Sequence, residues 1–513
     1  MLLRLRTFLM LFILAFVVTA VGCGGPETIN EPPRVATPAQ EEQISKVGQG
    51  GTARIVLPAS LAPDCMNPYL SKCDGTAAFT GMTLESPLVL GPSAEYRPLL
   101  AEAVPSFEGG SLALRPMTVE VRLRRGVNFS DGEPLTSADV RWTYEEAALL
   151  ARGGEISAIY SGFARIERIE TPDARTVRLV FREPYAGWRN LLTAPILPHH
   201  VYEDRNLKDL TLTRDPVGSG PFLLKRFARD GLRFIDTPRY WVSEPPYPNL
   251  EGIRVDFLAP ARVSGELSAG RADFGVFQTS EAVPKSGDLL RAAALSRVEL
   301  LVFNSRRLDD PAFRDRVARN VDRRSLIETS VAGAKPARSF MLPESSGYAP
   351  AWDRSGGASD AGSGTDETAE RRLDLVYPAE DPIRRELARK LAAQLSETGS
   401  KVSPRPVPAA RLQEVLEDGE FELALYTAGQ AADLEPLLPM LPPDSRRTFE
   451  ESLGDVDGSG LARAQETLAE DAALVPLFLW PDTYSWSSTL SGPRPDVPYQ
   501  SFGWNIREWG VYE

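Results

Sequence analysis

The chain has 513 residues, of which 42% are hydrophobic and 25% charged, a balance typical of a folded globular protein and not of a disordered or multi-span membrane chain. A formal net charge of -13 disfavours electrostatic binding to nucleic acid or to anionic lipid headgroups. The sequence holds only two histidines, the adjacent His199 and His200. A Ser-His-Asp hydrolase, or a metalloenzyme that needs several separate histidines, therefore has very few residues to draw on. We therefore expect no enzymatic activity, no metal, no cofactor and no nucleic acid partner.

The N-terminus has the pattern of an export signal. Two arginines precede an apolar run, residues 8–18, that is too short to span a bilayer. The segment Ala20-Val-Gly-Cys23 follows and resembles the lipobox of bacterial lipoproteins, in which the cysteine becomes the acylated N-terminus. We expect residues 1–22 to be removed and Cys23 to anchor the protein on the extracytoplasmic side of the cell membrane. An ordinary signal peptide with an incidental cysteine is the alternative.

The next segment and the remaining cysteines fit an exported protein. Residues 23–50 are rich in Gly, Pro, Glu and Gln, which predicts a flexible tether. Once Cys23 is acylated, Cys65 and Cys73 remain as an even pair in an oxidising compartment. We predict a Cys65–Cys73 disulfide, with two buried reduced thiols as the alternative.

The first half of the mature chain shows a strand, a turn and a helix in succession. Hydrophobic and polar residues alternate over 117–124, as in a half-buried strand. Asp131-Gly132 then predicts a turn, and Thr136 with Asp139 three residues later predicts a helix start. A second unit begins near Val298, with an apolar strand to 303 and a helix opened by Asp310-Pro311.

The segment after residue 370 predicts a βαβ unit. Its first strand covers 373–377, its helix starts at Asp381-Pro382, and its second strand covers 421–426. The helix has a core face, whose residues recur every four positions: Ile383, Leu387, Leu391 and Leu395. Ligands of open parallel sheets bind at the carboxyl ends of the strands, where the loop 427–433 lies. Asp433 is therefore a candidate ligand-binding residue by its position.

Several segments together resemble the family 5 extracytoplasmic solute-binding proteins, the peptide receptors of ABC importers. Arg125-Gly-Val-Asn-Phe-Ser-Asp-Gly-Glu-Pro-Leu-Thr-Ser-Ala-Asp-Val140 is very similar to the signature turn and helix start of that family. Further matching segments follow in the order of the family: Ala194-Pro-Ile-Leu-Pro-His-His200, Gly218-Ser-Gly-Pro-Phe222, Pro238-Arg-Tyr-Trp241, Phe303-Asn304 and Asp322-Arg323. Together they cover most of the chain from about residue 51 to residue 513.

The resemblance implies an α/β protein with the type II fold of periplasmic binding proteins: two lobes joined by a hinge, with a small domain inserted in the first lobe. We divide the chain accordingly. Lobe I comprises residues 51–80, 206–297 and the C-terminal return 477–513, the inserted small domain comprises 81–205, and lobe II comprises 298–476. We expect the chain to cross between the lobes near 298–304 and 475–480.

The resemblance also assigns a ligand-binding loop. Peptide receptors of the family carry an aspartate that pairs with the peptide α-ammonium, in a loop that Gln430-Ala-Ala-Asp433-Leu-Glu435-Pro436 resembles. It implies that Asp433 pairs with the ammonium and that Gln430, Ala431 and Glu435 are neighbouring ligand-binding positions. Gln430 replaces the tryptophan of the family and Leu434 its aromatic residue. We therefore expect a pocket without that aromatic wall, suited to a smaller or more polar solute.

We accordingly expect a lipid-anchored receptor that binds an oligopeptide or a similar small solute between its lobes and presents it to the permease subunits of an ABC importer. We expect it to act as a monomer and to contact the membrane through its N-terminal anchor only. A non-transporting sensor or structural lipoprotein on the same fold is the alternative. We expect His199 and His200 to be a surface pair, because adjacent side chains diverge and supply few ligands to one ion.

Overall fold

The structure is a computed structural model, and it describes residues 50–70, 73, 76–90, 96–185, 187–242, 247–277, 289–328, 331, 334–343, 348–352, 371–379, 381–396, 400–428, 431–452, 459–494 and 502–512. The predicted signal peptide, Cys23 and all of the predicted tether except Gly50 lie outside these residues.

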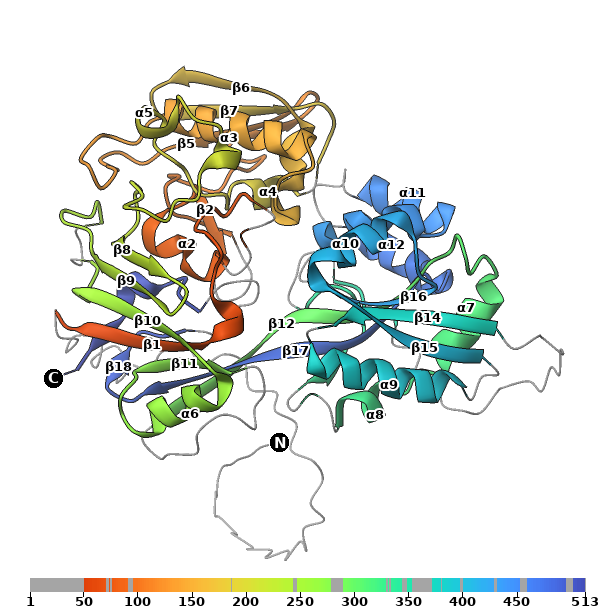
Figure 1. The fold of residues 1–513 in the computed structure, drawn as a ribbon. Helices are drawn as coiled ribbons and strands as arrows, with labels where there is room; N and C mark the ends of the chain where they lie inside the picture. Colours follow the sequence, from red (N-terminus) through yellow and green to blue (C-terminus); the bar gives the residue numbers. More distant parts are fainter. Residues whose placement is uncertain are drawn as a thin grey trace, which may run out of the picture. The chain divides into compact units, whose positions relative to one another are not determined.

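One mixed sheet forms the backbone of both lobes. Its strand order is β15-β14-β16-β12-β17-β11-β1-β10-β9-β8, and β13 pairs with β17 (Figure 1). In lobe I the strands are β1 (Thr52–Pro58), β8 (Phe222–Ala228), β9 (Gly231–Asp236), β10 (Gly252–Leu258) and β11 (Phe274–Phe277). In lobe II they are β13 (Lys335–Pro336), β14 (Arg371–Pro378), β15 (Ser400–Val407) and β16 (Leu423–Ala428). The fold is therefore α/β with two lobes, as predicted.

Two long strands connect the lobes. β12 (Leu289–Phe303) and β17 (Leu474–Ser487) pair with each other in antiparallel fashion along almost their whole length and run from lobe I into lobe II (Figure 1). Their register shifts twice, between Leu295 and Arg297 and between Glu299 and Leu300. Such irregularities bend a strand pair and increase its twist. The shifts lie where the strands pass from one lobe to the other, and we identify this stretch as the hinge.

The first loop of lobe I carries the predicted disulfide, because Cys65 and Cys73 are bonded. The side-chain amide of the buried Asn67 donates to the backbone carbonyls of Leu207 and Leu210, at 2.9 and 2.8 Å. The loop is thereby fixed to the stretch of chain that directly follows the inserted segment. The other elements of lobe I are η1 (Ala59–Leu61), α2 (Ala77–Thr83), α6 (Pro260–Ser268), β18 (Leu490–Ser491), η6 (Ile506–Glu508) and β19 (Gly510–Val511).

A separate antiparallel sheet lies within the segment predicted as the small domain. Its strand order is β4-β5-β7-β6, from β4 (Leu112–Leu114), β5 (Met117–Arg122), β6 (Ile166–Asp173) and β7 (Thr176–Phe181). α3 (Ser137–Arg152) packs on this sheet and begins with the predicted cap, a reciprocal capping box between Thr136 and Asp139. The segment also holds β2 (Leu88–Leu90), β3 (Tyr96–Pro98), η2 (Ala158–Arg165), α4 (Trp188–Leu191) and α5 (His199–Tyr202), and η3 (Leu207–Asp209) follows it.

Lobe II contains the parallel part of the mixed sheet, with helices packed against it. β14 pairs in parallel with both β15 and β16, and α9 (Pro382–Ser396) packs on β14 and β15. Leu387, Leu391 and Leu395 are fully buried, which confirms these three residues of the predicted core face, and Ile383 at the start of the helix is partly buried. The other helices are α7 (Pro311–Arg319), α8 (Arg323–Glu328), α10 (Ala409–Asp418), η5 (Ala431–Met440), α11 (Pro443–Ser452) and α12 (Ser459–Glu470).

The topology of lobe II differs from the sequence prediction at one strand. The crossover through α9 leads from β14 to β15, a strand that the sequence did not predict. The strand that was predicted as the second strand of the βαβ unit is β16, which lies on the other side of β14. β15 holds Pro404 and Pro406, and proline within a run argues against a central strand. β15 is the edge strand of the sheet, where missing N–H donors are tolerated.

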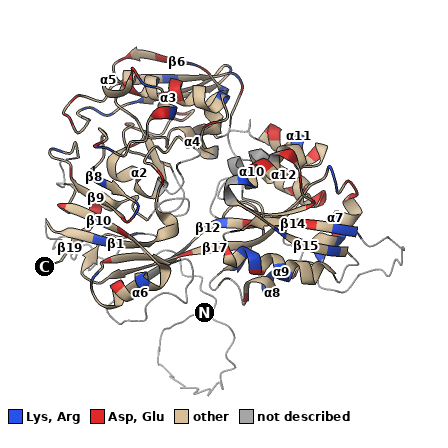
Figure 2. Cartoon of the chain, viewed as in Figure 1, with Lys and Arg blue, Asp and Glu red and all other residues tan. Residues whose placement is uncertain are grey.

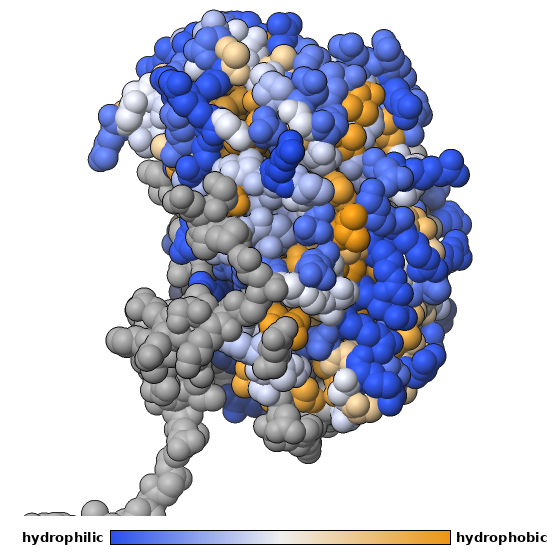
Figure 3. All heavy atoms as spheres, turned by 90° about the vertical axis from the view of Figure 1, so that its left-hand side faces the viewer, coloured by the Kyte–Doolittle hydropathy of each residue, from blue (hydrophilic) through white to orange (hydrophobic). Residues whose placement is uncertain are grey.

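Charged residues are distributed over both lobes. Figure 2 shows Lys and Arg interspersed with Asp and Glu along the elements. The face in Figure 3 is mostly hydrophilic, with apolar residues scattered between. No helix among the described residues is both long and apolar enough to cross a membrane.

Candidate functional site

The predicted ligand loop follows the carboxyl end of β16 in lobe II. Ala431, Asp433 and Glu435 lie on η5, and Gln430 lies outside the described residues. Leu434, which stands where the family motif has an aromatic residue, is fully buried. Its side chain therefore belongs to the core and does not form a wall for a ligand.

η5 is also the place where lobe II meets the small domain. η2 lies against η5. The buried Tyr160 of η2 and the buried Leu434 and Leu437 of η5 belong to one continuous apolar cluster. The segment that carries Asp433 is thus in contact with both lobe II and the inserted domain.

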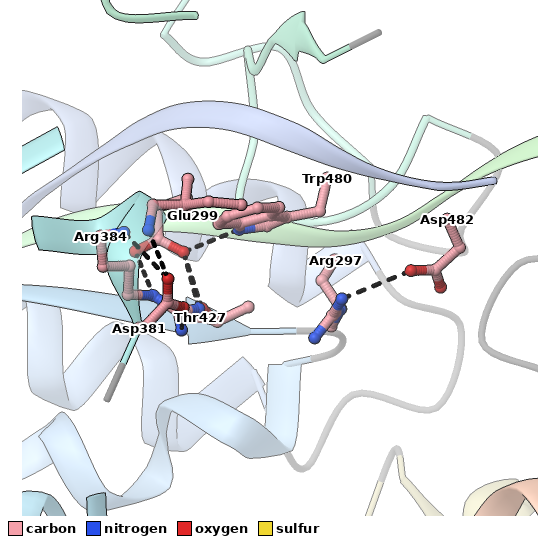
Figure 4. Close-up of polar contacts among 8 residues, drawn as sticks. Arg297, Glu299, Asp381, Arg384, Thr427, Trp480 and Asp482 are labelled. Carbon is pink, nitrogen blue, oxygen red and sulfur yellow. Dashed lines mark hydrogen bonds and ion pairs between the residues drawn. The ribbon is translucent and has the colours of Figure 1, made fainter. Parts of the chain in front are cut away.

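A buried polar cluster lies beside this segment, at the carboxyl ends of β14 and β16 (Figure 4). Its centre is Glu299 of β12, whose side chain is fully buried. The Oε2 atom of Glu299 accepts a hydrogen bond from the indole Nε1 of Trp480 on β17, at 2.8 Å, and from the hydroxyl of Thr427 on β16, at 2.7 Å. One carboxylate thereby links both connecting strands to the strand that leads into the ligand loop.

Arg384 of α9 completes this cluster. Its Nε lies 3.0 Å from Oε1 of Glu299, its Nη1 lies 2.7 Å from Oδ2 of Asp381, and its Nη2 donates to the hydroxyl of Thr427 (Figure 4). The guanidinium also lies over the ring of Trp480, 5.4 Å from its centroid. Burial alone would lower the pKa of Arg384, but Glu299 and Asp381 outweigh it and raise the pKa above its ordinary value. Two acidic side chains thus contact one arginine in this cluster.

The local sequence explains how α9 places Arg384. Asp381 precedes the helix, and its Oδ1 accepts hydrogen bonds from the backbone N–H groups of Ile383 and Arg384, at 2.9 and 3.0 Å. This is helix N-capping, and Pro382 in the first turn needs no N–H partner. The cap fixes the first turn of the helix, and the arginine in that turn points at Glu299.

Sequence reasoning missed the residues of this cluster, Glu299, Arg384, Thr427 and Trp480. One signal was present: Glu299 lies in the otherwise apolar run Val298–Phe303, and a charged residue within a buried strand requires a partner. The partner could not be identified from the sequence, because Arg384 lies 85 positions away.

The histidine pair has carboxylate partners in the small domain. His199 Nδ1 lies 2.8 Å from Oδ1 of the buried Asp139, and His200 Nε2 lies 2.8 Å from Oδ2 of Asp131. Both histidine side chains are partly exposed. Candidate ligand atoms of Asp139, His199 and His200 lie within 4.8 Å of one another. Asp139 also accepts hydrogen bonds from the backbone N–H groups of Thr136 and His199, so these contacts join α5 to the start of α3.

Comparisons with known proteins agree with this fold. The model of the bacterial extracellular solute-binding proteins, family 5, matches residues 95–442. Protein XP55 of Streptomyces lividans is 26% identical over 418 residues, which cover 74% of this chain and 73% of that protein.

Two solved structures show the same fold. The oligopeptide-binding protein AppA from Bacillus subtilis, in complex with a nonapeptide, has a TM-score of 0.70 at 17% identity, covering 91% of this chain and 100% of that one. A periplasmic EDTA-binding protein has a TM-score of 0.76 at 18% identity, covering 94% and 100%. The two-lobed fold and the family match over most of the described chain lead to one conclusion: the chain belongs to the bacterial extracellular solute-binding proteins of family 5.

Proposed function

We propose that the chain is the substrate-binding protein of an ABC importer, which captures a peptide or a similar small solute between its lobes and delivers it to a membrane permease without changing it chemically. The observation that carries this proposal is the pair of long strands, β12 and β17, that joins two lobes beside the Asp433 segment. Closure about such a hinge traps a ligand that binds the closed form better than the open form.

We propose that Asp433 pairs with an ammonium group of the solute, with Gln430, Ala431 and Glu435 as neighbouring positions. The buried cluster of Glu299, Asp381 and Arg384 supports a cationic group here, because its acidic side chains outnumber its one arginine at the same edge of the sheet. A paired carboxylate selects for charge more than it adds affinity, because desolvation offsets much of the attraction. The fold itself permits a wide range of solutes, since neighbours of similar structure bind a nonapeptide and EDTA.

The binding proposal is tested by calorimetry with tri-alanine and its N-acetylated form. We expect Asp433→Asn to weaken binding of the free amine about ten-fold or more, as for loss of a charge-assisted hydrogen bond, and to leave the acetylated form almost unchanged. Asp444→Asn is a matched control, because Asp444 is exposed in the same lobe and pairs with Arg447 on the surface. Equal losses for both peptides would remove the ammonium role of Asp433. No heat and no change in small-angle scattering with any peptide would overturn peptide capture.

We further propose that Cys23 is acylated and that residues 24–50 tether the protein to the extracytoplasmic face of the membrane. The supporting observation is the order of charged, apolar and small residues before Cys23. Replacing Cys23 by serine should abolish metabolic labelling with a fatty acid and release the protein from membranes. Unchanged labelling of the variant would exclude Cys23 as the lipid attachment site.

A further inference from the structure

Arg189 of α4 is a half-buried arginine without an acceptor for its guanidinium among the described residues. Its guanidinium lies over the ring of Trp188, with Cζ 4.5 Å from the ring centroid. Tyr96 is the other group near its charge, and the Tyr96 hydroxyl donates a hydrogen bond to Oδ1 of Asn190, at 3.0 Å. Trp188 is fully buried, so it provides a fixed support for the guanidinium.

Arg314 is a second buried arginine, and its guanidinium has hydrogen-bond acceptors that compensate for its removal from water. Burial lowers the pKa of both Arg189 and Arg314. The guanidinium of Arg314 donates to the backbone carbonyls of Leu308, Asp309 and Asp471, at 2.7 to 3.2 Å. Removing a guanidinium from water is unfavourable unless its N–H groups find acceptors. Arg314 has them within the described chain, and Arg189 does not.

The position of Arg189 indicates where an acceptor would come from. α4 packs against η2, and η2 packs against η5, the segment that carries Asp433. Figure 1 places α4 on the side of the small domain that faces lobe II. The hydroxyl of Ser161 on η2 is also buried without a hydrogen-bond partner among the described residues. Unpaired polar groups therefore lie on the small-domain side of the region where we place the solute.

We propose that Arg189 binds a carboxylate of the captured solute, so that the preferred solute carries an acidic group on its small-domain side. An arginine stacked on an aromatic ring keeps the N–H groups at its edge available, and these match the two oxygens of a carboxylate. The inference rests on the proposed solute capture, but not on the solute being a peptide. Together with the ammonium role proposed for Asp433, this would select a zwitterion by its two ends.

The test uses calorimetry on the full mature protein with three probes: tri-alanine, its C-terminal amide and glutarate. We expect amidation to weaken binding to the native protein, and Arg189→Gln to weaken tri-alanine and glutarate about ten- to a hundred-fold while changing the affinity for the amide by less than about three-fold. Arg189→Lys should give an intermediate loss, because lysine keeps the charge but not the paired N–H groups. Arg182→Gln, at an exposed position of the same domain, is the control and should change none of the three affinities.

The outcomes separate this inference from the peptide proposal. If the native protein binds glutarate but neither peptide, and Arg189→Gln weakens glutarate, the carboxylate role stands and peptide capture fails. If tri-alanine and its amide bind equally well and Arg189→Gln affects neither, peptide capture stands and the carboxylate role is overturned. If Arg189 has a purely structural role, Arg189→Gln should lower the unfolding temperature and weaken the binding of all three probes equally, and this result would overturn the carboxylate role. A native protein that binds neither tri-alanine nor glutarate would overturn it as well. An unfolding temperature of Arg189→Lys equal to that of the native protein would show that its weaker binding does not come from loss of folding.

Discussion

Glu299 and Glu85 are two buried acidic residues whose side chains have different hydrogen-bonding and charged partners. Each accepts a hydrogen bond from a tryptophan indole N–H, Trp480 for Glu299 and Trp241 for Glu85, at 2.8 and 2.6 Å. Glu299 is also in direct contact with a guanidinium, that of Arg384. Glu85 instead accepts a second hydrogen bond from the neutral hydroxyl of Tyr240.

The two clusters also differ in which group has a shifted pKa. Burial raises the pKa of Glu85 to about 7, and Tyr240, Trp241 and the charge of Arg507 lower it only in part. In the other cluster the carboxylates hold the pKa of Arg384 above its ordinary value. A cation in direct contact with an acidic side chain favours its charged form, whereas for Glu85 hydrogen bonds and a charge that does not touch it leave burial as the dominant effect on the pKa.

Breaking the ion pair of Glu299 should give the largest effect. Arg384→Met leaves the fully buried Glu299 without its cation, and we expect the free energy of unfolding to fall by about 3 to 5 kcal/mol. Urea unfolding followed by circular dichroism measures this loss.

Two further variants establish the cause of that loss. Glu299→Gln combined with Arg384→Met should recover much of the stability, because no uncompensated charge remains buried. Arg385→Met changes the next residue of α9, which is exposed, and should cost less than about 0.5 kcal/mol. A double variant that is no more stable than Arg384→Met alone would show that packing, and not charge, is the cause.

Features that depend on neighbouring residues could be predicted from the sequence. The capping role of Asp381 and the buried face of α9 follow from local spacing, and both were predicted from neighbouring residues. The disulfide and the two-lobed fold were also predicted, from cysteine count and from family motifs. These features are encoded in short segments, so one sequence is enough to find them.

The polar clusters and β15 were not predicted, because their determinants are not local. Glu299 and Arg384 meet only through the pairing of β12 with β16 and the packing of α9, and Glu85 lies 155 positions from Tyr240. β15 was missed because its prolines are compatible with a strand only at the sheet edge, and edge position is a property of the whole sheet. The side-chain role of Asp433 remains a prediction from resemblance.

Titration of Glu85 should give an intermediate effect that depends on pH. Its pKa rises from 4.5 to about 7 on folding, so the native state binds its proton more tightly than the unfolded state does. The stabilisation from this proton is complete below about pH 4.5 and is lost as the pH rises to about 7. We expect a loss of about 2 to 3 kcal/mol across this window in the native protein. Glu85→Gln, which resembles the protonated acid, should lack this component of the pH dependence in urea unfolding between pH 4.5 and 8, whereas parallel profiles would mean that Glu85 keeps its charge.

The smallest effect should come from an ion pair on the same connecting strands that is not buried. Nη2 of Arg297 on β12 lies 3.4 Å from Oδ1 of Asp482 on β17, and the two side chains are 51% and 30% exposed (Figure 4). Water screens such a pair, so Arg297→Ala should lower the free energy of unfolding by less than about 1 kcal/mol, and 0.5 M salt should reduce that difference further. This pair and the Glu299 pair lie within two residues of each other on β12, so their comparison holds location constant and varies burial. If Arg297→Ala destabilised the protein as much as Arg384→Met does, position on the hinge strands, and not burial, would determine the contribution of an ion pair.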